Sequence, residues 1–235
     1  VFRLAQLTSR TRSLLTAGRE PFLGRSVQDF YRLPAGVTDI DKGGTLRFGF
    51  PHANPIFRAL GLAHRGGGPP RWGATLQRRI REAWLESRTF EFETFADFLP
   101  NPGTRVTLDD SATDRHGTPS ARIDLAVPDH HLQAGRFLAD RGLEILETAG
   151  AHDLEATAVG ETTGHLVHGT CRAGTDPATS VLDRDGCAHD VPNLYVSDGS
   201  YFPSAGGVPT TLTILANATR IAERIAERAR RGELR

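Results

Sequence analysis

Methionine is absent from this sequence of 235 residues, even at position 1, and cysteine is nearly absent. A chain without an initiating methionine is expected to be either processed or part of a longer protein. The two cysteines, Cys171 and Cys187, form no CxxC pair and are too few to hold a fold together by disulfides. The cysteine content predicts a protein of a reducing compartment, cytoplasmic by default unless a targeting signal lies in a missing N-terminus.

An excess of either charge is also lacking. Lysine and arginine together number 28, as do aspartate and glutamate, so the formal net charge is zero. No global field then draws the chain to nucleic acid or to an anionic membrane surface. Apolar runs of about 18 residues, which a membrane-spanning helix needs, do not occur. We expect a soluble protein that acts on a small molecule, with no nucleic acid, membrane or metal ion as a partner.

The hydropathy pattern predicts an α+β fold, with a sheet and helices on one side of it. Stretches with a helical period alternate with stretches of period two, separated by glycine, proline and aspartate. The predicted helices cover residues 1–20, 54–65, 75–87 and 129–150, and the predicted strands cover 45–50, 88–100, 104–108 and 120–127. We assign residues 1–160 to one domain and residues 161–235 to a C-terminal segment.

This C-terminal segment is predicted to form a strand, a turn and a helix. The strand ends at Asp198-Gly199, and Gly206-Gly207 then bends the chain into a helix that begins near Thr210. The N–H groups of a helix start carry partial positive charge and favour an anion. The helix is predicted to bury an apolar stripe, made of Leu212, Leu215, Ala218, Ala222 and Ile225.

Two motifs of the C-terminal segment resemble the signature of a known enzyme family. Residues 164–177 read GHLVHGTCRAGTDP, and residues 193–214 read NLYVSDGSYFPSAGGVPTTLTI. In their order and spacing they resemble the C-terminal signature of the glucose-methanol-choline (GMC) family of FAD-dependent oxidoreductases. That signature runs roughly HxxGTxxMG, then NLxVxDGSxFP, then GGVNPTLTI. A weaker likeness to sugar-oxidising members of the family reaches back to about residue 88.

The resemblance implies both a fold and an activity. Residues 1–160 would be part of the substrate-binding domain, and residues 161–235 the flavin-facing segment, which packs on a Rossmann-like FAD-binding domain. The chain would belong to an enzyme that oxidises a CH–OH group of an alcohol or sugar to a carbonyl, with hydride transfer to FAD and a histidine as general base. The implied cofactor-binding residues are Asp198, Gly199, Pro209, Thr210 and Thr211.

The histidine of the family's first motif is displaced in this sequence. Without a gap, its position falls on Leu166, with His165 one residue earlier and His168 directly before Gly169. Either a one-residue bulge brings His165 to the site, or His168 points into it. Both histidines are therefore candidates for the catalytic base.

The second catalytic position of the family is also changed. It is a histidine or asparagine in the family and Pro209 in this sequence. Proline has no side-chain donor or acceptor, so a hydroxyl of Thr210 or Thr211 would have to replace the missing group.

A dinucleotide-binding loop of the form GxGxxG is missing from the sequence. The family places the FAD pyrophosphate on such a loop. The chain therefore resembles the C-terminal portion of a longer enzyme, and an N-terminal FAD-binding portion or subunit would be its partner. The alternative is a non-catalytic remnant or interaction subunit that lacks FAD. Leu166 and Pro209 favour this alternative, whereas the retained DGS turn and helix bend favour the enzyme.

Overall fold

The computed structural model describes residues 2–3, 25–49, 55–64, 68–83, 91–152, 154 and 168–234. The chain forms two compact units that alternate along the sequence. The first unit combines residues 1–95 with 133–161, and the second combines residues 96–132 with 162–235. Helices and antiparallel strands are both present, which agrees with the predicted α+β class. Within the described part of the chain, every helix is too short or too polar to cross a lipid bilayer.

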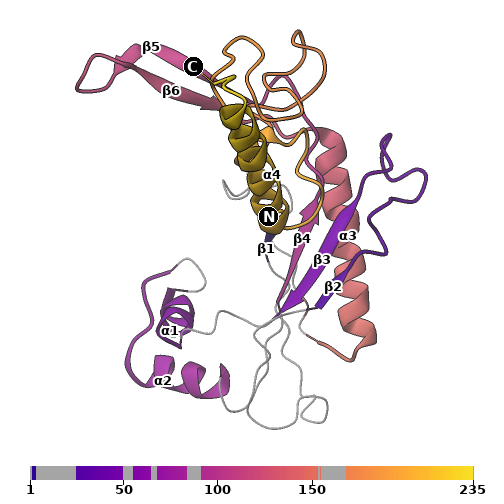
Figure 1. Ribbon diagram of the computed structural model, residues 1–235. Helices are drawn as coiled ribbons and strands as arrows, with labels where there is room; N and C mark the ends of the chain where they lie inside the picture. The colour runs from indigo at the N-terminus through magenta and orange to yellow at the C-terminus, as the bar shows by residue number, and fades with distance from the viewer. Residues whose placement is uncertain are drawn as a thin grey trace. The chain divides into compact units, whose positions relative to one another are not determined.

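A four-stranded sheet is the centre of the first unit (Figure 1). In spatial order the strands are β1 (Phe2–Arg3), β4 (Glu91–Ala96), β3 (Gly44–Gly49) and β2 (Arg25–Val27). β1 pairs antiparallel with β4, and β2 pairs antiparallel with β3. In β4 the buried Phe92 and Thr94 flank the half-buried Glu93, which is the alternation of a strand with one covered face.

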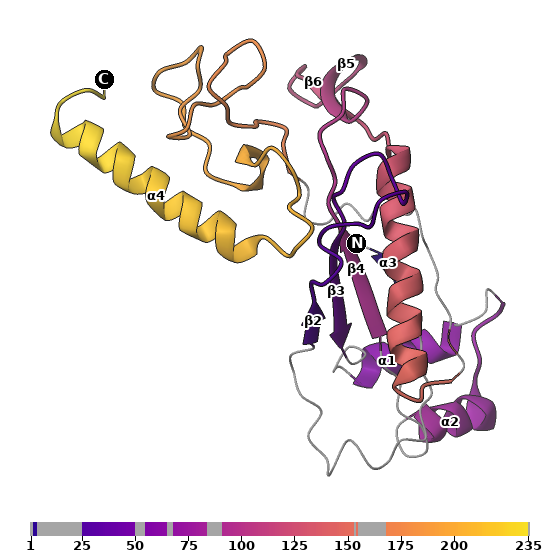
Figure 2. The same ribbon diagram turned by 90° about the vertical axis from the view of Figure 1, so that its right-hand side faces the viewer.

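The helix α3 (Asp129–Thr148) covers one face of this sheet, as Figures 1 and 2 both show. Gly142 marks a close approach, because a Cβ at this position would lie 2.5 Å from the ring of Phe92 on β4. The helix ends in a Schellman motif, in which Gly150 has a φ of 85° and the N–H of Ala151 donates to the carbonyl of Leu146. The helix predicted for residues 129–150, with Gly150 as its stop signal, is confirmed.

Two shorter helices of the first unit contact each other. They are α1 (Pro55–His64) and α2 (Gly73–Arg81). The N–H of Arg71 donates to the carbonyl of Ala63 over 2.9 Å, which ties the connection between the helices to α1. Both helices were expected from the sequence, α1 with a proline in its first turn, where a missing N–H does no harm.

The second unit combines a β-hairpin, a long loop region and the C-terminal helix. The hairpin consists of β5 (Arg105–Thr113) and β6 (Pro119–Asp124), which pair antiparallel. Residues 168–209 are mostly irregular, apart from a 3₁₀ helix at Gly199–Tyr201. Helix α4 (Thr211–Arg230) follows, and the loop region lies along it in Figure 2.

Two predicted elements are wrong. Phe2 and Arg3 form a strand with Glu93 and Thr94 rather than the start of a helix, and residues 4–20 of that predicted helix lie outside the described residues. The predicted strand before Asp198 does not form, since only Tyr195 makes an isolated bridge, with Cys187. The segment around Cys187 that pairs with Tyr195 is short, because the chain turns directly before Cys187. In this turn the N–H of Gly186 donates to the carbonyl of Asp183.

The buried stripe of α4 is rotated from the predicted one. Leu212 and Leu215 are 81% and 58% exposed, whereas Ile221 on the opposite face is 1% exposed. Of the other predicted stripe residues, Ala222 is exposed, and Ala218 and Ile225 are half-buried. The physical reason is a close approach of the loop region, because Gly186 has no side chain and lies directly against Ile221. The helix therefore turns its Ile221 side, not its Leu212 side, towards the loop region.

Candidate functional site

His168 contacts the residue that directly precedes α4. Its Nε2 atom lies 2.6 Å from the Oγ1 atom of Thr210, although the two residues are 42 positions apart. Thr210 is buried and is the N-cap of α4. The edge of the His168 ring faces the ring of Phe202, with the ring centroids 6.2 Å apart. The imidazole is therefore held between the start of α4 and the segment that follows the DGS turn.

The two motifs predicted to form one site are joined by backbone hydrogen bonds. The N–H of Cys171 donates to the carbonyl of Ser200 over 3.1 Å, and the N–H of Ala173 donates to the carbonyl of Tyr201 over 2.9 Å. Gly169 has a φ of 87°, and a Cβ there would lie 3.3 Å from the carbonyl oxygen of Phe202. This glycine therefore serves both a left-handed turn and a close backbone approach.

Asp198 organises the turn rather than pointing a reactive group at His168. Its carboxylate accepts the N–H of Ser200 over 2.8 Å and the hydroxyl of Ser200 over 2.5 Å. These bonds cap the 3₁₀ helix and hold the pKa of Asp198 below its ordinary value, the hydroxyl contributing most. The carboxylate is exposed and charged at neutral pH, and its role in this structure is to fix the path of Gly199 to Tyr201.

The start of α4 presents backbone N–H groups. Thr210 makes no side-chain capping bond to the helix, because its hydroxyl faces His168 instead, and the first turn contains no acidic residue. Gly206 and Gly207, with φ values of 72° and 61°, bend the chain into the helix as predicted. A helix start without a side-chain cap offers its N–H groups and partial positive charge to a polar or anionic group.

The structure brings together some of the predicted site residues. His168 and Thr210 are in contact, while Pro209 and Thr211 on either side of Thr210 are exposed. His165 and Leu166 lie outside the described residues. The bulge that would bring His165 to the site remains a prediction.

One residue of the site was missed by sequence analysis. Asp97 directly follows β4 and is 2% exposed, and its Oδ1 atom accepts the N–H of Gly206 over 2.8 Å. A single acidic residue inside the apolar run Phe95 to Leu99 is the signal that could have singled it out. Its partner could not have been found, since Gly206 is 109 positions away in the chain.

His131, in the first turn of α3, is a second buried polar residue that contacts Asp97. It is 4% exposed, and its Nδ1 atom lies 3.2 Å from the carbonyl oxygen of Asp97. Its ring meets the ring of Phe98 edge-on, with centroids 4.7 Å apart. Burial lowers the pKa of His131, an effect that the backbone hydrogen bond partly opposes.

Comparison with known proteins identifies one family. The model of the GMC oxidoreductase family matches residues 100–218 of the chain. The match covers about half of the 235 residues and includes His168, Asp198 and Thr210.

Three relatives are similar to a larger part of the chain than the family model covers. Paromamine 6'-oxidase of Streptomyces fradiae is 36% identical over 203 residues, which is 82% of this chain and 37% of that protein. 2-Methyl-1,2-propanediol dehydrogenase of Mycolicibacterium austroafricanum is 32% identical over 195 residues, 81% of this chain and 35% of that protein. 6'''-Hydroxyparomomycin C oxidase of Streptomyces lividus is 41% identical over 136 residues, 57% of this chain and 24% of that protein. The chain thus spans between 24% and 37% of the length of these relatives.

Proposed function

Because this chain belongs to the GMC oxidoreductase family and matches its C-terminal portion, we propose that it forms the substrate-facing and flavin-facing part of an enzyme that oxidises a CH–OH group to a carbonyl. The substrate class is an alcohol or sugar, which the names of the relatives, two oxidases and a diol dehydrogenase, support. Residues 1–160 would contribute to substrate binding and residues 161–235 to the flavin-facing segment. FAD, when bound, supplies the acceptor for the hydride that leaves the substrate carbon.

The observation that carries this proposal is the contact between His168 and Thr210. At 2.6 Å, the N–H at Nε2 of a neutral His168 can donate to the Thr210 hydroxyl oxygen, and in that tautomer Nδ1 is the nitrogen that carries no proton. A neutral imidazole is a suitable base for a substrate hydroxyl at neutral pH. His168 would accept the hydroxyl proton at Nδ1, and the Thr210 hydroxyl would orient the ring through Nε2. Pro209 has no polar group for this second task.

The residues at the start of α4 fit a flavin ring. The helix start has no side-chain cap and no acidic residue in its first turn. Preorganised N–H groups and a helix dipole stabilise negative charge that develops on a neighbouring group during reaction. Thr210 and Thr211 would help to hold the flavin, and Gly206 and Gly207 would shape the backbone that leads to them.

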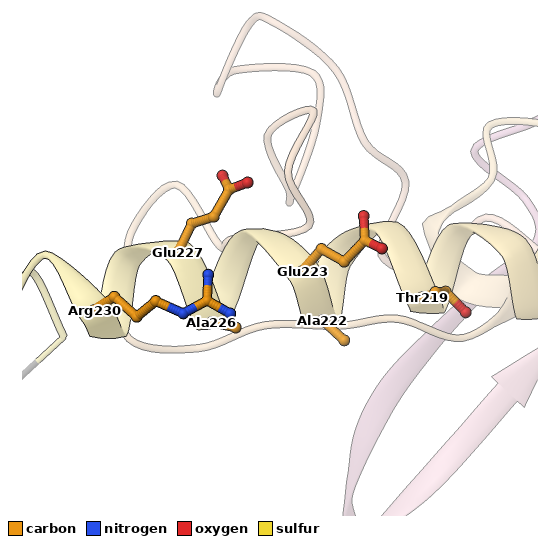
Figure 3. Close-up of a pocket in the computed structure, with 6 residues that line it drawn as sticks. All are labelled: Thr219, Ala222, Glu223, Ala226, Glu227 and Arg230. Carbon is orange, nitrogen blue, oxygen red and sulfur yellow. The ribbon is translucent and has the colours of Figure 1, made fainter.

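The outer face of α4 fits a contact with the FAD-binding portion. Leu212 and Leu215 are exposed on it, and a shallow depression continues along the same helix (Figure 3). Six residues line this depression: Thr219, Ala222, Glu223, Ala226, Glu227 and Arg230. Exposed apolar side chains gathered on one face indicate an interaction surface. We propose that the part of the enzyme that this chain does not span, as a preceding domain or a separate subunit, packs here.

Substitution of the histidines in the FAD-loaded enzyme tests the catalytic proposal. His168→Ala should lower turnover by about 10²–10⁴-fold with unchanged flavin content, because it removes the base and leaves the cofactor site intact. His189→Ala is the matched control, since His189 contacts Ser180 at 3.0 Å and not α4. A larger loss in His165→Ala than in His168→Ala would assign the base to His165 and contradict the role given to His168.

The packing proposal has a separate test. Leu215→Glu should lower the flavin content of the purified enzyme, because a charge on the outer face of α4 opposes an apolar contact. Leu60→Glu, on the exposed side of α1, is the control and should leave flavin content unchanged. Equal flavin content in both variants would contradict packing on this face.

A non-catalytic role is the second candidate, and Pro209 is the observation that favours it. The non-catalytic role would be supported if the protein that contains this chain binds FAD and no alcohol or sugar reduces that FAD. Pro209→Asn would then be the first substitution expected to restore reduction, because it returns the family's amide group to this position.

A further inference from the structure

Asp97 is a buried carboxylate with a defined partner. It is 2% exposed, follows the last residue of β4, and accepts the N–H of Gly206 over 2.8 Å through Oδ1. Moving a carboxylate out of water is unfavourable unless hydrogen bonds compensate for the lost hydration. An apolar residue at this position would avoid that cost, so the bond to Gly206 is a reason for the acid to be there.

The segment that carries Asp97 is held on two sides. On the first side, the carbonyl of Phe98 accepts the N–H of Ala205 over 3.3 Å. The consecutive residues Asp97 and Phe98 are thus bonded to the consecutive residues Ala205 and Gly206. On the second side, the carbonyl of Asp97 lies 3.2 Å from Nδ1 of the buried His131, at the start of α3. Asp97 therefore contacts Gly206 from a fixed position.

Gly206 is where the chain most needs such support. Gly206 and Gly207 are consecutive residues in the left-handed region, and glycine loses more conformational freedom on folding than any other residue. Thr210 follows only four positions after Gly206, and its hydroxyl meets His168. A change in the bend would therefore move Thr210 relative to His168.

We propose that Asp97 is a positioning residue, which fixes the Gly206-Gly207 bend and through it the contact between Thr210 Oγ1 and His168 Nε2. This inference rests on the proposed function, in which that contact orients the base. Asp97 acts through its acceptor oxygen and takes no proton from the substrate. A misplacement of about 1 Å in a catalytic group lowers the rate on the order of 10²-fold, so loss of this bond should be visible in kcat.

Three variants of the FAD-loaded enzyme that contains this chain test the proposal. Asp97→Ala removes the acceptor, and Asp97→Asn keeps an oxygen acceptor without the charge. Thr94→Val removes a buried hydroxyl from the preceding strand, β4, without touching the bend. Crystal structures give the distance between His168 Nε2 and Thr210 Oγ1. Steady-state kinetics give kcat, KM and the pH profile for each variant.

In Asp97→Ala we expect the distance to exceed about 3.5 Å, the limit of a hydrogen bond, and kcat to fall about 10²-fold with little change in KM or flavin content. Asp97→Asn should keep the distance, the pH profile and kcat within about threefold of the wild type, because a neutral acceptor still holds the N–H. Thr94→Val should resemble the wild type. An Asn variant as impaired as the Ala variant would overturn the positioning role, as would an Ala variant with an unchanged distance.

If Asp97→Ala does not fold, Asp97→Glu replaces it, since it keeps the charge and displaces the acceptor by one methylene. An unchanged distance and kcat in Asp97→Glu would overturn the proposal. The proposed function has its own test. It would fail if His168→Ala kept the turnover of the wild type. The distance measured in the Asp97 variants tests the positioning role in either case.

Discussion

Gly186 and Ile221 lie so close together that no side chain fits at position 186. A Cβ on Gly186 would lie 2.6 Å from Cδ1 of Ile221 and 3.0 Å from the carbonyl oxygen of Val196. Gly186 also accepts the N–H of Val196 over 2.9 Å, so the backbone has little freedom to withdraw. This contact fixes which face of α4 is buried against the loop region.

Gly186→Ala is therefore expected to destabilise the protein by about 2–4 kcal/mol, from the left-handed backbone and the overpacked contact together. Gly117→Ala is the matched control, because Gly117 has nearly the same φ, 80° against 79°, with nothing within 4 Å of its Cβ position. It should cost only about 1–2 kcal/mol. Urea unfolding measures both values. Equal losses in the two variants would show that the contact with Ile221 is not a steric limit.

Thr210→Val should lower kcat about tenfold, because it removes one hydrogen bond of about 1.4 kcal/mol from His168 and keeps the shape of the side chain. Thr213→Val is the control, since Thr213 is an exposed threonine of the same helix and has no part in the proposed site. Flavin content should not change in either variant. Wild-type kcat in Thr210→Val would remove Thr210 from the catalytic arrangement.

The parts of the fold that sequence analysis predicted depend on short stretches of chain. The helix α3 has a clear apolar period and a glycine stop signal, and its Schellman motif uses only residues 146–151. The strands β3, β4 and β5 follow local alternation in the same way. Such elements are readable because the residues that determine them are close in sequence.

The parts that were missed depend on contacts between distant residues. Helix α4 has apolar residues on two faces, Leu212 and Leu215 on one and Ile214 and Ile221 on the other. Its own period cannot show which face the loop region covers. The bond from Asp97 to Gly206 spans 109 positions, and no local pattern indicates it.

The choice between the two histidines has the same origin. The first motif places His165 and His168 near one another, and only the position of α4 decides which one it meets. The structure gives His168 a contact with Thr210, whereas His165 lies outside the described residues. Sequence analysis therefore leaves two candidates for the proposed base, and the choice of His168 remains a proposal that rests on its contact with Thr210.

Arg220 is expected to tolerate replacement by lysine poorly. Its guanidinium lies 3.3 Å from the carboxylate of Asp185 and donates over 2.7 Å to the carbonyl of Arg184, while it also faces the ring of Tyr201. Lysine has no planar fork to make these contacts at once. Arg220→Lys should lower the free energy of unfolding by about 1 kcal/mol.

The control for this prediction is Arg224→Lys, one helical turn further along α4. Arg224 pairs with Asp185 and Glu227 at an exposed position, and such pairs contribute little. Its replacement should change the free energy of unfolding by less than about 0.5 kcal/mol. Equal shifts of the urea unfolding midpoint in the two variants would show that Arg220 is an ordinary surface charge.

The stability of the protein should depend on pH through His131. Burial holds the pKa of this histidine below 6.5 in the folded state, so the unfolded chain binds a proton there at a higher pH than the folded chain does. The free energy of unfolding should therefore fall as the pH decreases below about 6.5, by at most about 1.4 kcal/mol per pH unit, and level off below the folded pKa.

His131→Gln removes this contribution, so the difference in free energy of unfolding between wild type and variant should narrow or reverse towards low pH. His116→Gln, at the exposed hairpin turn, should leave the slope as it is. Urea unfolding between about pH 5 and pH 8 measures the three curves. Parallel curves for the wild type and His131→Gln would show that the folded and unfolded states bind this proton equally well.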